Sequence, residues 1–221
     1  MQKIKYIVFD MDGTLLDSLT DLHNSLNHCF DKVGFQRRTY REVRSLVGNG
    51  IRTLIERAVP QGTSEEKIEE IFVMFKEHYM VHCADFTAPY DGIMEMLDGL
   101  KKRGYRMAIV SNKADAAVKV LTEEFFGNYI EVAVGDMEGK RKKPAPDLVW
   151  LAMEQLGGAT KENTIYVGDS EVDYETAVNS GLQCISGLWG FRDKELLKGY
   201  GADCFAGTPQ EVVNMLEDEI C

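Results

Sequence analysis

A chain of 221 residues in which 44% are hydrophobic and 28% are charged has the composition of an ordinary globular protein and can bury a sizeable core. Its formal net charge of −11 argues against nucleic acid or an anionic membrane as a partner, because the averaged field repels phosphate groups. No apolar run reaches the length of a transmembrane helix, and residues 1–3 lead into a short strand instead of a signal peptide, so we expect a cytoplasmic protein.

The first predicted element is a buried strand over residues 4–9, and two acids follow it. Asp10 and Asp12 belong to the sequence DMDGT. Because side chains two apart in an extended segment project to the same side, both carboxylates can reach one small volume at the end of the strand. Gly13 permits a sharp turn there, and Thr14 adds a hydroxyl and a backbone N–H. Asp-Gly alone is also typical of a turn in which Asp10 caps a helix, so the rest of the chain must decide.

A helical stretch follows, from Ser18 to about His82. Residues 18–21 have the pattern of a capping box, and apolar residues mark one helical face up to Gly34. Further helices are expected over residues 40–47 and 51–59, and from a cap at 63–66 to about His82. The simplest organisation is a helical cap inserted at residues 17–82, with residues 1–16 and 83–221 forming one core.

After Pro89 the pattern alternates between helices and short apolar strands, which is typical of a parallel, doubly wound sheet. We therefore predict an α/β fold with a Rossmann-like core. Helices are expected at residues 93–103, 114–126, 147–156 and 171–179 and from Thr208 onward, and strands at 106–110, 129–134, 164–168, 183–186 and 203–205.

Polar side chains follow several of these strands. They fall at the carboxyl edge of the predicted sheet, where open α/β sheets bind their ligands. The residues concerned are Ser111 and Asn112 after the strand at 106–110, Asp169 and Asp173 around the turn after the strand at 164–168, and Lys143 on the loop before the preceding helix.

Each of these residues also has a simpler interpretation. Ser111 could cap the following helix, and Asp169 and Asp173 could stabilise a helix N-terminus through its dipole. The basic run KRKK at residues 140–143 could be a solvated loop. These interpretations do not explain why the residues share one edge with the two acids after the first strand. Their joint placement favours metal-assisted phosphoryl transfer.

Together these residues resemble the four motifs of the haloacid dehalogenase superfamily of phosphohydrolases. DMDGT at residues 10–14 is similar to the first motif and Ser111 to the second; Lys143 with Pro144 is similar to the third, and GDSEVD at 168–173 to the fourth. The resemblance covers the chain end to end, including a helical insertion where that superfamily has its alpha-helical cap. The segments at 46–52, 89–92 and 188–190 resemble the phosphoglycolate phosphatase group in particular.

The resemblance implies a role for each motif residue. Asp10 would be the nucleophile that forms an aspartyl-phosphate, and Asp12 would be the general acid and base. Mg²⁺ would be held by Asp10, the backbone carbonyl of Asp12 and Asp169. The remaining roles would be a positive charge from Lys143, phosphate binding by Thr14, Ser111 and Asn112, and orientation of Lys143 or of metal-bound water by Asp173.

The predicted cap would decide the substrate. The resemblance places Asn49, Gly50 and Arg52 over the active site, where N–H groups or a guanidinium would bind a small carboxylate such as that of 2-phosphoglycolate. Gly-Asn-Gly at residues 48–50 is equally typical of a plain turn between helices.

The sequence therefore predicts a Mg²⁺-dependent phosphomonoester hydrolase, acting on 2-phosphoglycolate or a similar small phosphorylated metabolite as a monomer or weak dimer. A pyrophosphatase fits nearly as well, and a phosphomutase would use the same two aspartates. Dehalogenases of the superfamily do not keep an acid at the position of Asp12, which argues against carbon–halogen cleavage. A receiver-like module that holds a phospho-aspartate as a signal is the alternative from another functional class.

Overall fold

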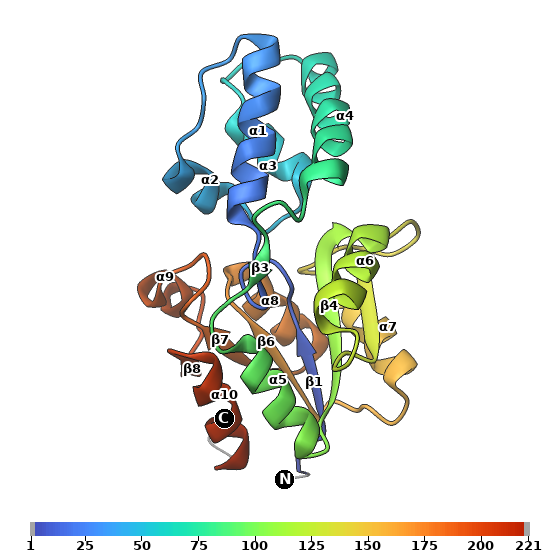
Figure 1. Cartoon of the computed structure of the whole chain (residues 1–221). Helices are drawn as coiled ribbons and strands as arrows, with labels where there is room; N and C mark the ends of the chain where they lie inside the picture. The colour runs from blue at the N-terminus through green and yellow to red at the C-terminus, as the bar shows by residue number, and fades with distance from the viewer. Residues whose placement is uncertain (1–2, 219–221) are drawn as a thin grey trace. The chain divides into compact units, whose positions relative to one another are not determined.

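The structure is a computed structural model that describes residues 3–218, and the chain forms two compact units (Figure 1). The core unit runs up to Leu16 and resumes at Pro89, and the helical unit spans Asp17–Ala88. Within residues 3–218, no helix combines the length and the apolar character that a bilayer-spanning segment needs.

A six-stranded sheet forms the centre of the core unit, in the order β5-β4-β1-β6-β7-β8. All of its strand pairs are parallel, which confirms the predicted α/β fold class. The central strand lies between two neighbours in register, so that Phe9 aligns with Ile109 on one side and with Val167 on the other. The strands are β1 (Tyr6–Phe9), β4 (Arg106–Ala114), β5 (Val132–Asp136), β6 (Thr164–Gly168), β7 (Gln183–Gly187) and β8 (Phe205–Ala206).

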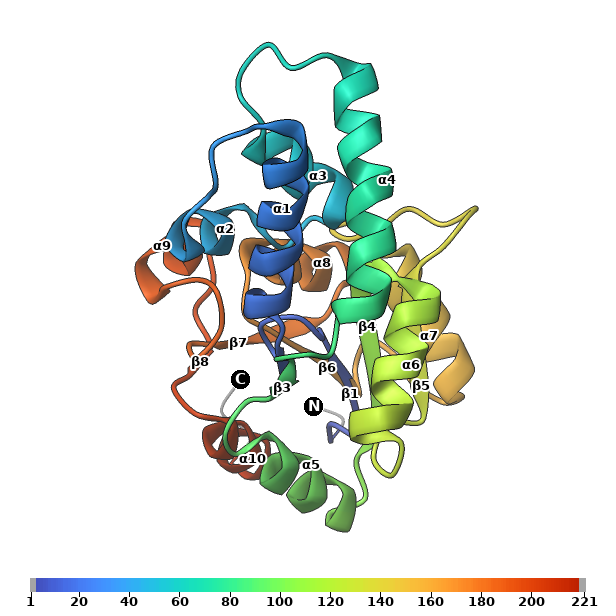
Figure 2. The same ribbon diagram turned by 45° about the horizontal axis from the view of Figure 1, so that its top comes forward.

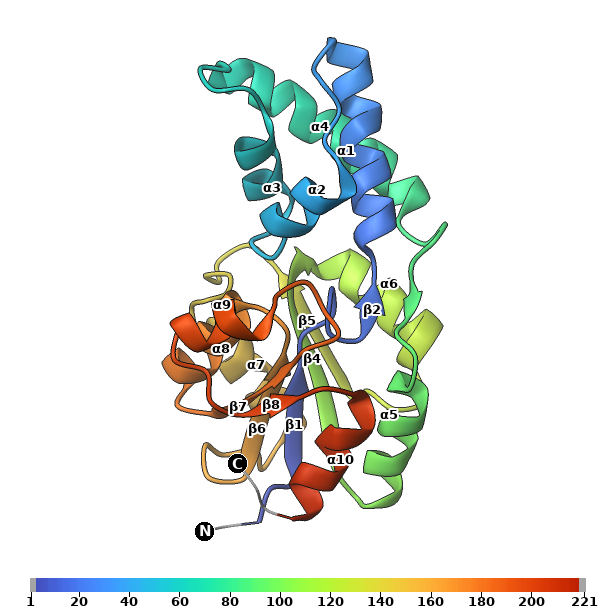
Figure 3. The same ribbon diagram turned by 90° about the vertical axis from the view of Figure 1, so that its left-hand side faces the viewer.

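Helices cover both faces of this sheet, as Figure 3 shows. Successive side chains of a strand point to opposite faces, so Ile7 and Phe9 pack on one side and Val8 on the other. The first face is covered by α5 (Ile93–Lys102), α6 (Asp115–Phe126) and α10 (Pro209–Glu217), and the second by α7 (Asp147–Leu156) and α8 (Glu171–Ser180).

The helical unit consists of four helices, as predicted, and α1 and α4 run side by side in it (Figure 2). The carboxylate of Asp21 near the start of α1 accepts hydrogen bonds from the backbone N–H groups of Phe86 and Thr87 and from the Thr87 hydroxyl, at 2.8 to 3.2 Å. These bonds tie the first helix to the segment that follows the last one. The helices are α1 (Leu19–Val33), α2 (Tyr40–Leu46), α3 (Ile51–Ala58) and α4 (Glu65–His82).

Several short elements differ from the sequence prediction. β2 (Leu16–Asp17) and β3 (Ala88–Pro89) form a separate two-stranded sheet, and α9 (Lys194–Gly199) is a further short helix. Elements this short carry no periodic pattern that a sequence could reveal. Strand β4 continues to Ala114, beyond its predicted end at residue 110. The residues after Val110 are extended but polar, so no apolar pattern marks them as part of the strand.

The capping box predicted at Ser18 is wrong, because the Ser18 side chain makes no capping hydrogen bond to α1. Two capping boxes form elsewhere in the described chain. Thr39 caps α2 together with Glu42, and Ser170 caps α8 together with Asp173. The second of these places Asp173 at the carboxyl edge of the sheet.

Candidate active site

Three neighbouring strands of the core unit end at the same edge, and each delivers predicted site residues there. Asp10 follows β1, and its backbone N–H donates to the carbonyl of Val167 in β6 at 2.9 Å. Ser111 belongs to the extended end of β4, and Asp169 follows β6 directly. Topology therefore brings together acids that are far apart in the sequence, as the pattern predicted.

The turn after Asp10 depends on a glycine. Gly13 has a φ of +95°, and a Cβ there would lie 2.6 Å from both carboxylate oxygens of Asp169. Glycine adopts this conformation without strain and leaves room for the acid. The next residue, Thr14, donates from its hydroxyl to Asp169 Oδ1 at 2.9 Å.

Asp169 is fully buried, and its two oxygens have different donors. Thr14 binds Oδ1, while the backbone N–H of Phe191 donates to Oδ2 at 2.7 Å. Burial and the nearby charge of Asp173 raise the pKa of Asp169 to about 7, against the effect of these hydrogen bonds. The carboxylate is thus poised to exchange its proton for a cation near neutral pH.

Lys143 connects two other buried acids. Its Nζ lies 2.7 Å from Asp10 Oδ1 and 2.8 Å from Asp173 Oδ1, and it donates to the hydroxyl of Tyr166 at 3.0 Å. Burial alone would lower the pKa of Lys143, but the charges of Asp10 and Asp173 outweigh it and raise the pKa. The side chain therefore stays an ammonium, which neutralises part of the acidic site.

The two acids that Lys143 contacts have opposite pKa shifts. Burial raises the pKa of Asp173, but Lys143 and the hydroxyls of Ser170 and Tyr166 stabilise its anion and bring the pKa below the ordinary value. Burial and the charge of Asp173 hold the pKa of Asp10 well above the ordinary value, although Lys143 lowers it. Asp173 is thus the fixed anion, and Asp10 is the acid that a further cation would ionise.

Three buried aspartates of the core unit form a candidate metal centre. One carboxylate oxygen from each of Asp10, Asp169 and Asp173 lies within 4.8 Å of the others. Such an all-oxygen donor set suits a hard divalent cation. The predicted donor set contains the backbone carbonyl of Asp12 in place of Asp173, and that part stays a prediction. The carboxylate of Asp12 contacts Lys113.

The sequence motifs assign no role to Lys113, which directly follows Asn112. Its Nζ lies 3.0 and 3.1 Å from the two carboxylate oxygens of Asp12, and its side chain is 4% exposed. The signal that could have found it is its position two residues after Ser111 in an extended strand, which places both side chains on the same side. Backbone donors such as the N–H of Phe191 leave no sequence signal.

Ser111 and Asn112 lie at the same edge and support neighbouring backbone. Ser111 Oγ accepts the backbone N–H of Lys113 at 3.2 Å, and Asn112 Nδ2 donates to the carbonyl of Lys143 at 3.1 Å. The alternative in which Ser111 caps a helix is wrong, because α6 begins after Ala114. The alternative for Asp173 is partly right, because it caps α8 as well as binding Lys143.

A profile of the family described as haloacid dehalogenase-like hydrolase matches residues 7–186. The chain belongs to this family. The match contains all the strand ends described above, and the predicted resemblance is confirmed. Its relatives and its family identify this hydrolase as a phosphatase.

Relatives of this hydrolase carry two kinds of name. The phosphoglycolate phosphatase of Aquifex aeolicus is 30% identical over 218 residues, which are 98% of this chain and 99% of that protein. The N-acetylmuramic acid 6-phosphate phosphatase of Pseudomonas aeruginosa is 27% identical over 221 residues, covering 99% and 97%. A crystal structure from Lactobacillus delbrueckii subsp. bulgaricus, assigned as a phosphoglycolate phosphatase, has a TM-score of 0.92 at 31% identity and covers 97% and 99%.

The predicted cap residues of the hydrolase lie in the helical unit, around the start of α3. Gly50 precedes this helix with a φ of +83°, and Asn49 lies in the turn before it. Arg52 pairs with three carboxylates of its own unit, with Glu56 at 3.0 Å and with Glu65 and Glu69. A substrate carboxylate would therefore compete with these partners, and the role of the three cap residues stays a prediction.

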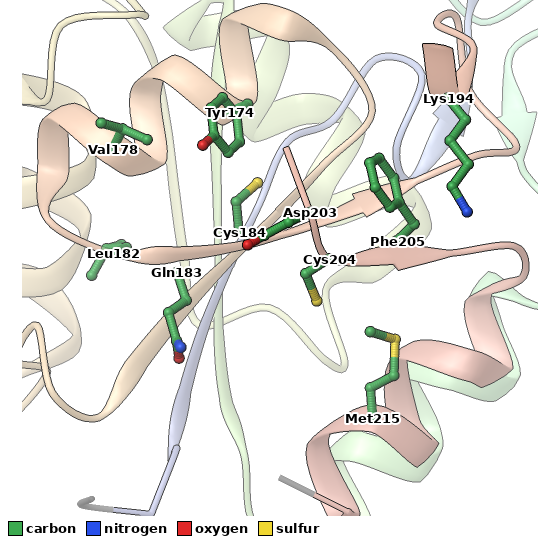
Figure 4. A pocket seen from close by; sticks show the side chains of 10 residues that line it. All are labelled: Tyr174, Val178, Leu182, Gln183, Cys184, Lys194, Asp203, Cys204, Phe205 and Met215. Carbon is green, nitrogen blue, oxygen red and sulfur yellow. The ribbon is translucent and has the colours of Figure 1, made fainter. Parts of the chain in front are cut away.

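A separate hollow of about 620 Å³ in the core unit has no predicted site residue in its lining (Figure 4). Tyr174 and Val178 of α8 and Met215 of α10 lie around it, with Gln183 and Cys184 from β7. This hollow and the cluster of aspartates thus draw on different residues.

Proposed function

We propose that the protein is a Mg²⁺-dependent phosphomonoester hydrolase that works through an aspartyl-phosphate on Asp10. The observation that carries the proposal is the buried cluster in which Lys143 bridges Asp10 and Asp173 beside Asp169. The proposal keeps a substrate-selecting cap inserted into the core, predicted at residues 17–82 with the core at 1–16 and 83–221, whereas in the structure the helical unit continues to Ala88. It also keeps a cytoplasmic protein, monomeric or weakly dimeric, without nucleic-acid partners.

Asp10 is the nucleophile in this proposal. A carboxylate oxygen of Asp10 attacks phosphorus, the bond from phosphorus to the ester oxygen breaks, and the alcohol leaves. Lys143, 2.7 Å from Asp10 Oδ1, keeps the nucleophile oriented and reduces its repulsion from an anionic phosphate. Water then attacks phosphorus, the bond to Asp10 breaks, and inorganic phosphate is released.

Asp12 moves protons in both halves of this reaction. It gives a proton to the departing alkoxide, and afterwards it takes one from the water that hydrolyses the aspartyl-phosphate. Asp12 lies two residues beyond the nucleophile, and Lys113 binds both of its carboxylate oxygens. Donors at the same edge, namely Thr14, Ser111 and Asn112, would bind the oxygens of the phosphoryl group that do not react.

Mg²⁺ fits the donor set, which consists of carboxylate oxygens without histidine or cysteine ligands. Asp10, Asp169 and the backbone carbonyl of Asp12 would hold the ion. Asp173 is less suited to do so, because each of its oxygens already accepts two or more hydrogen bonds, one of them from the Lys143 ammonium. When bound, the ion supplies positive charge against the repulsion between nucleophile and phosphate.

The proposed substrate is 2-phosphoglycolate or a similar small phosphomonoester. Support comes from relatives named phosphoglycolate phosphatase at about 30% identity, and a relative named for a sugar phosphate lies at 27%. Relatives of similar identity thus carry names for different substrates. Pyrophosphate hydrolysis is therefore one arm of the test, and isomerisation of a hexose phosphate without phosphate release would indicate a phosphomutase.

Phosphate release from a panel of substrates tests the proposal. The panel contains 2-phosphoglycolate, N-acetylmuramic acid 6-phosphate, pyrophosphate and a hexose phosphate, each with Mg²⁺ or with EDTA. We expect turnover of a monoester with Mg²⁺, none with EDTA, and a loss of about a thousandfold or more in Asp10→Asn. Turnover that resists EDTA or persists in Asp10→Asn would contradict the proposal. A long-lived phospho-aspartate without turnover would favour a receiver-like module.

A further inference from the structure

The proposed mechanism gives the positive charge of Lys113 no role toward the substrate. This lysine is one of three buried cations among the described residues, with Lys143 and Arg192. Lys143 binds Asp10 and Asp173, and Arg192 pairs with Glu171 at 2.7 Å. Of these three cations, Lys113 is therefore the one that pairs with Asp12.

We propose that Lys113 is a specificity-determining residue that binds an anionic group on the leaving alcohol of the substrate. The inference rests on the proposed function, in which Asp12 protonates the leaving oxygen. That oxygen must come within hydrogen-bond distance of Asp12 during the reaction. Because the Lys113 ammonium already lies within 3.1 Å of both Asp12 oxygens, groups a few bonds beyond the leaving oxygen come within its reach.

Electrostatics favour an anionic group at this position. An alcohol carrying a carboxylate is repelled by the carboxylates of Asp10 and Asp12 as it binds, and a compact ammonium beside Asp12 offsets that repulsion. In 2-phosphoglycolate, one methylene separates the leaving oxygen from the carboxylate, so Asp12 and Lys113 would contact neighbouring groups of one molecule. Arg52 of the helical unit already pairs with three glutamates, with which a substrate carboxylate would have to compete.

Two esters that differ in the charge of the alcohol test the inference. We would compare kcat and KM for 2-phosphoglycolate and for 2-hydroxyethyl phosphate, whose alcohol is neutral, in the wild type and in Lys113→Gln. Glutamine keeps an N–H donor for Asp12 and removes the charge. We expect kcat/KM for 2-phosphoglycolate to fall about 10- to 100-fold more than the value for the neutral ester, with the difference mainly in KM, while a loss shared by both esters reports the contact of Lys113 with Asp12.

Two further variants make the result specific. Lys119→Gln removes an exposed lysine of α6 that pairs with Asp115, and it should leave both esters unaffected. Lys113→Arg keeps the charge but moves it, so its effect should be larger on 2-phosphoglycolate than on the neutral ester. If Lys113→Gln does not fold, Lys113→Arg and the preference of the wild type decide.

Several results would overturn the inference. Equal losses on both esters in Lys113→Gln would mean that Lys113 only positions Asp12. A wild type without preference for the anionic ester, or an equal change on both esters in Lys113→Arg, would also contradict it. A wild type that hydrolyses other monoesters of the panel but neither of these two would overturn the inference alone, whereas one that hydrolyses no monoester with Mg²⁺ would contradict the proposed function itself, so the two failures are distinguishable.

Discussion

Lys143 is the residue on which the electrostatics of the candidate site depend most. Its ammonium stabilises the anion of Asp173 and contacts Asp10. Burial nevertheless keeps the pKa of Asp10 well above the ordinary value. Buried acids this close together would otherwise repel one another and hold protons. A single lysine thus lets one aspartate act as a fixed anion while another stays available for chemistry.

Replacing Lys143 with methionine should leave Asp10 and Asp173 buried without their shared cation. We expect the free energy of unfolding to fall by about 3 to 5 kcal/mol and phosphate release to be lost, because an uncompensated buried charge is costly. Urea denaturation measures the first and a phosphate assay the second. Lys140→Met, at an exposed position on the same loop, is the matched control. A change in Lys143→Met no larger than in the control would contradict this account.

The raised pKa of Asp169, about 7, predicts how metal binding depends on pH. Between the ordinary aspartate pKa and this value the folded, metal-free protein holds the proton more tightly than the unfolded chain, so its stability falls as the pH rises through this window. A cation must displace the proton, so the affinity for Mg²⁺ should rise about tenfold per pH unit below that pKa.

Titration calorimetry in two buffers of different ionisation enthalpy measures the protons released when Mg²⁺ binds. We expect more protons to be released at about pH 6 than at about pH 8, because Asp169 loses its proton between them. An affinity that does not depend on pH, with no proton release, would show that the carboxylate is already ionised or does not bind the ion.

At the scale of elements, regular patterns made most of the fold predictable. The short continuous apolar runs of β1, β4 and β6 reflect burial on both faces of the sheet, and the apolar faces of α1 and α4 reflect burial on one side of each helix, so both leave a pattern in the sequence. The two-residue strands β2, β3 and β8 and the short helix α9 depend on tertiary pairing and carry no such record. Strand β8 accordingly lies at Phe205–Ala206, later than the predicted 203–205.

The helical unit also contains a stack of histidines between α1 and α4. The ring centroids of His28 and His78 are 4.0 Å apart, and those of His78 and His82 are 4.3 Å apart. His78 also contacts Ser25 Oγ at 3.0 Å, and His82 pairs with Asp85. Burial first, and then the neighbouring histidines, lower the pKa of His78, with Asp85 opposing them. Protonation of His78 is therefore unfavourable in the folded unit.

Acid should consequently destabilise the helical unit through His78. Because the folded-state pKa lies below the unfolded value, the unfolded chain binds more protons as the pH falls below about 6.5, and stability is lost in that range. Thermal unfolding at about pH 7 and about pH 5 should show a smaller acid-induced drop in Tm for His78→Gln than for the wild type. His23→Gln, outside the stack, is the control. Identical drops in all three proteins would contradict this interpretation.

At the scale of the whole molecule, the chain leaves and re-enters the core unit at one place. The helical unit spans Asp17–Ala88, and the strands at its two ends, β2 and β3, pair with each other. Each unit has its own buried side chains, such as Phe9 in one and Phe75 in the other. Because the chain leaves and re-enters the core unit at adjacent points, the inserted unit does not interrupt the packing of the core.

A chain in which a short Gly-Ser linker replaces residues 18–87 should therefore fold. We expect cooperative thermal unfolding and retained Mg²⁺ binding, because Asp10, Asp169 and Asp173 all belong to the core unit. Circular dichroism and calorimetry measure the two properties. An insoluble or non-cooperative product would mean that the core unit requires the helical unit to fold.

Most of the candidate site could be predicted because its residues follow strands that meet at one edge. Asp10, Ser111, Lys143 and Asp169 carry chemistry in their side chains and sit at recognisable positions. The contacts that orient them could not be predicted, since the turn that brings Phe191 to Asp169 is a backbone contact made over 22 residues. Sequence patterns record burial and side-chain type, whereas such contacts depend on the folded path of the chain.

Trapping the phosphorylated protein is the most direct test of the central claim that Asp10 forms an aspartyl-phosphate. The protein is mixed with a radiolabelled phosphomonoester that it hydrolyses and Mg²⁺, and the reaction is stopped with acid before the first turnover ends. We predict label on the wild-type chain that hydroxylamine removes, as expected for an acyl phosphate, and no label on Asp10→Asn. Turnover without any labelled protein, or label that persists in Asp10→Asn, would contradict the account.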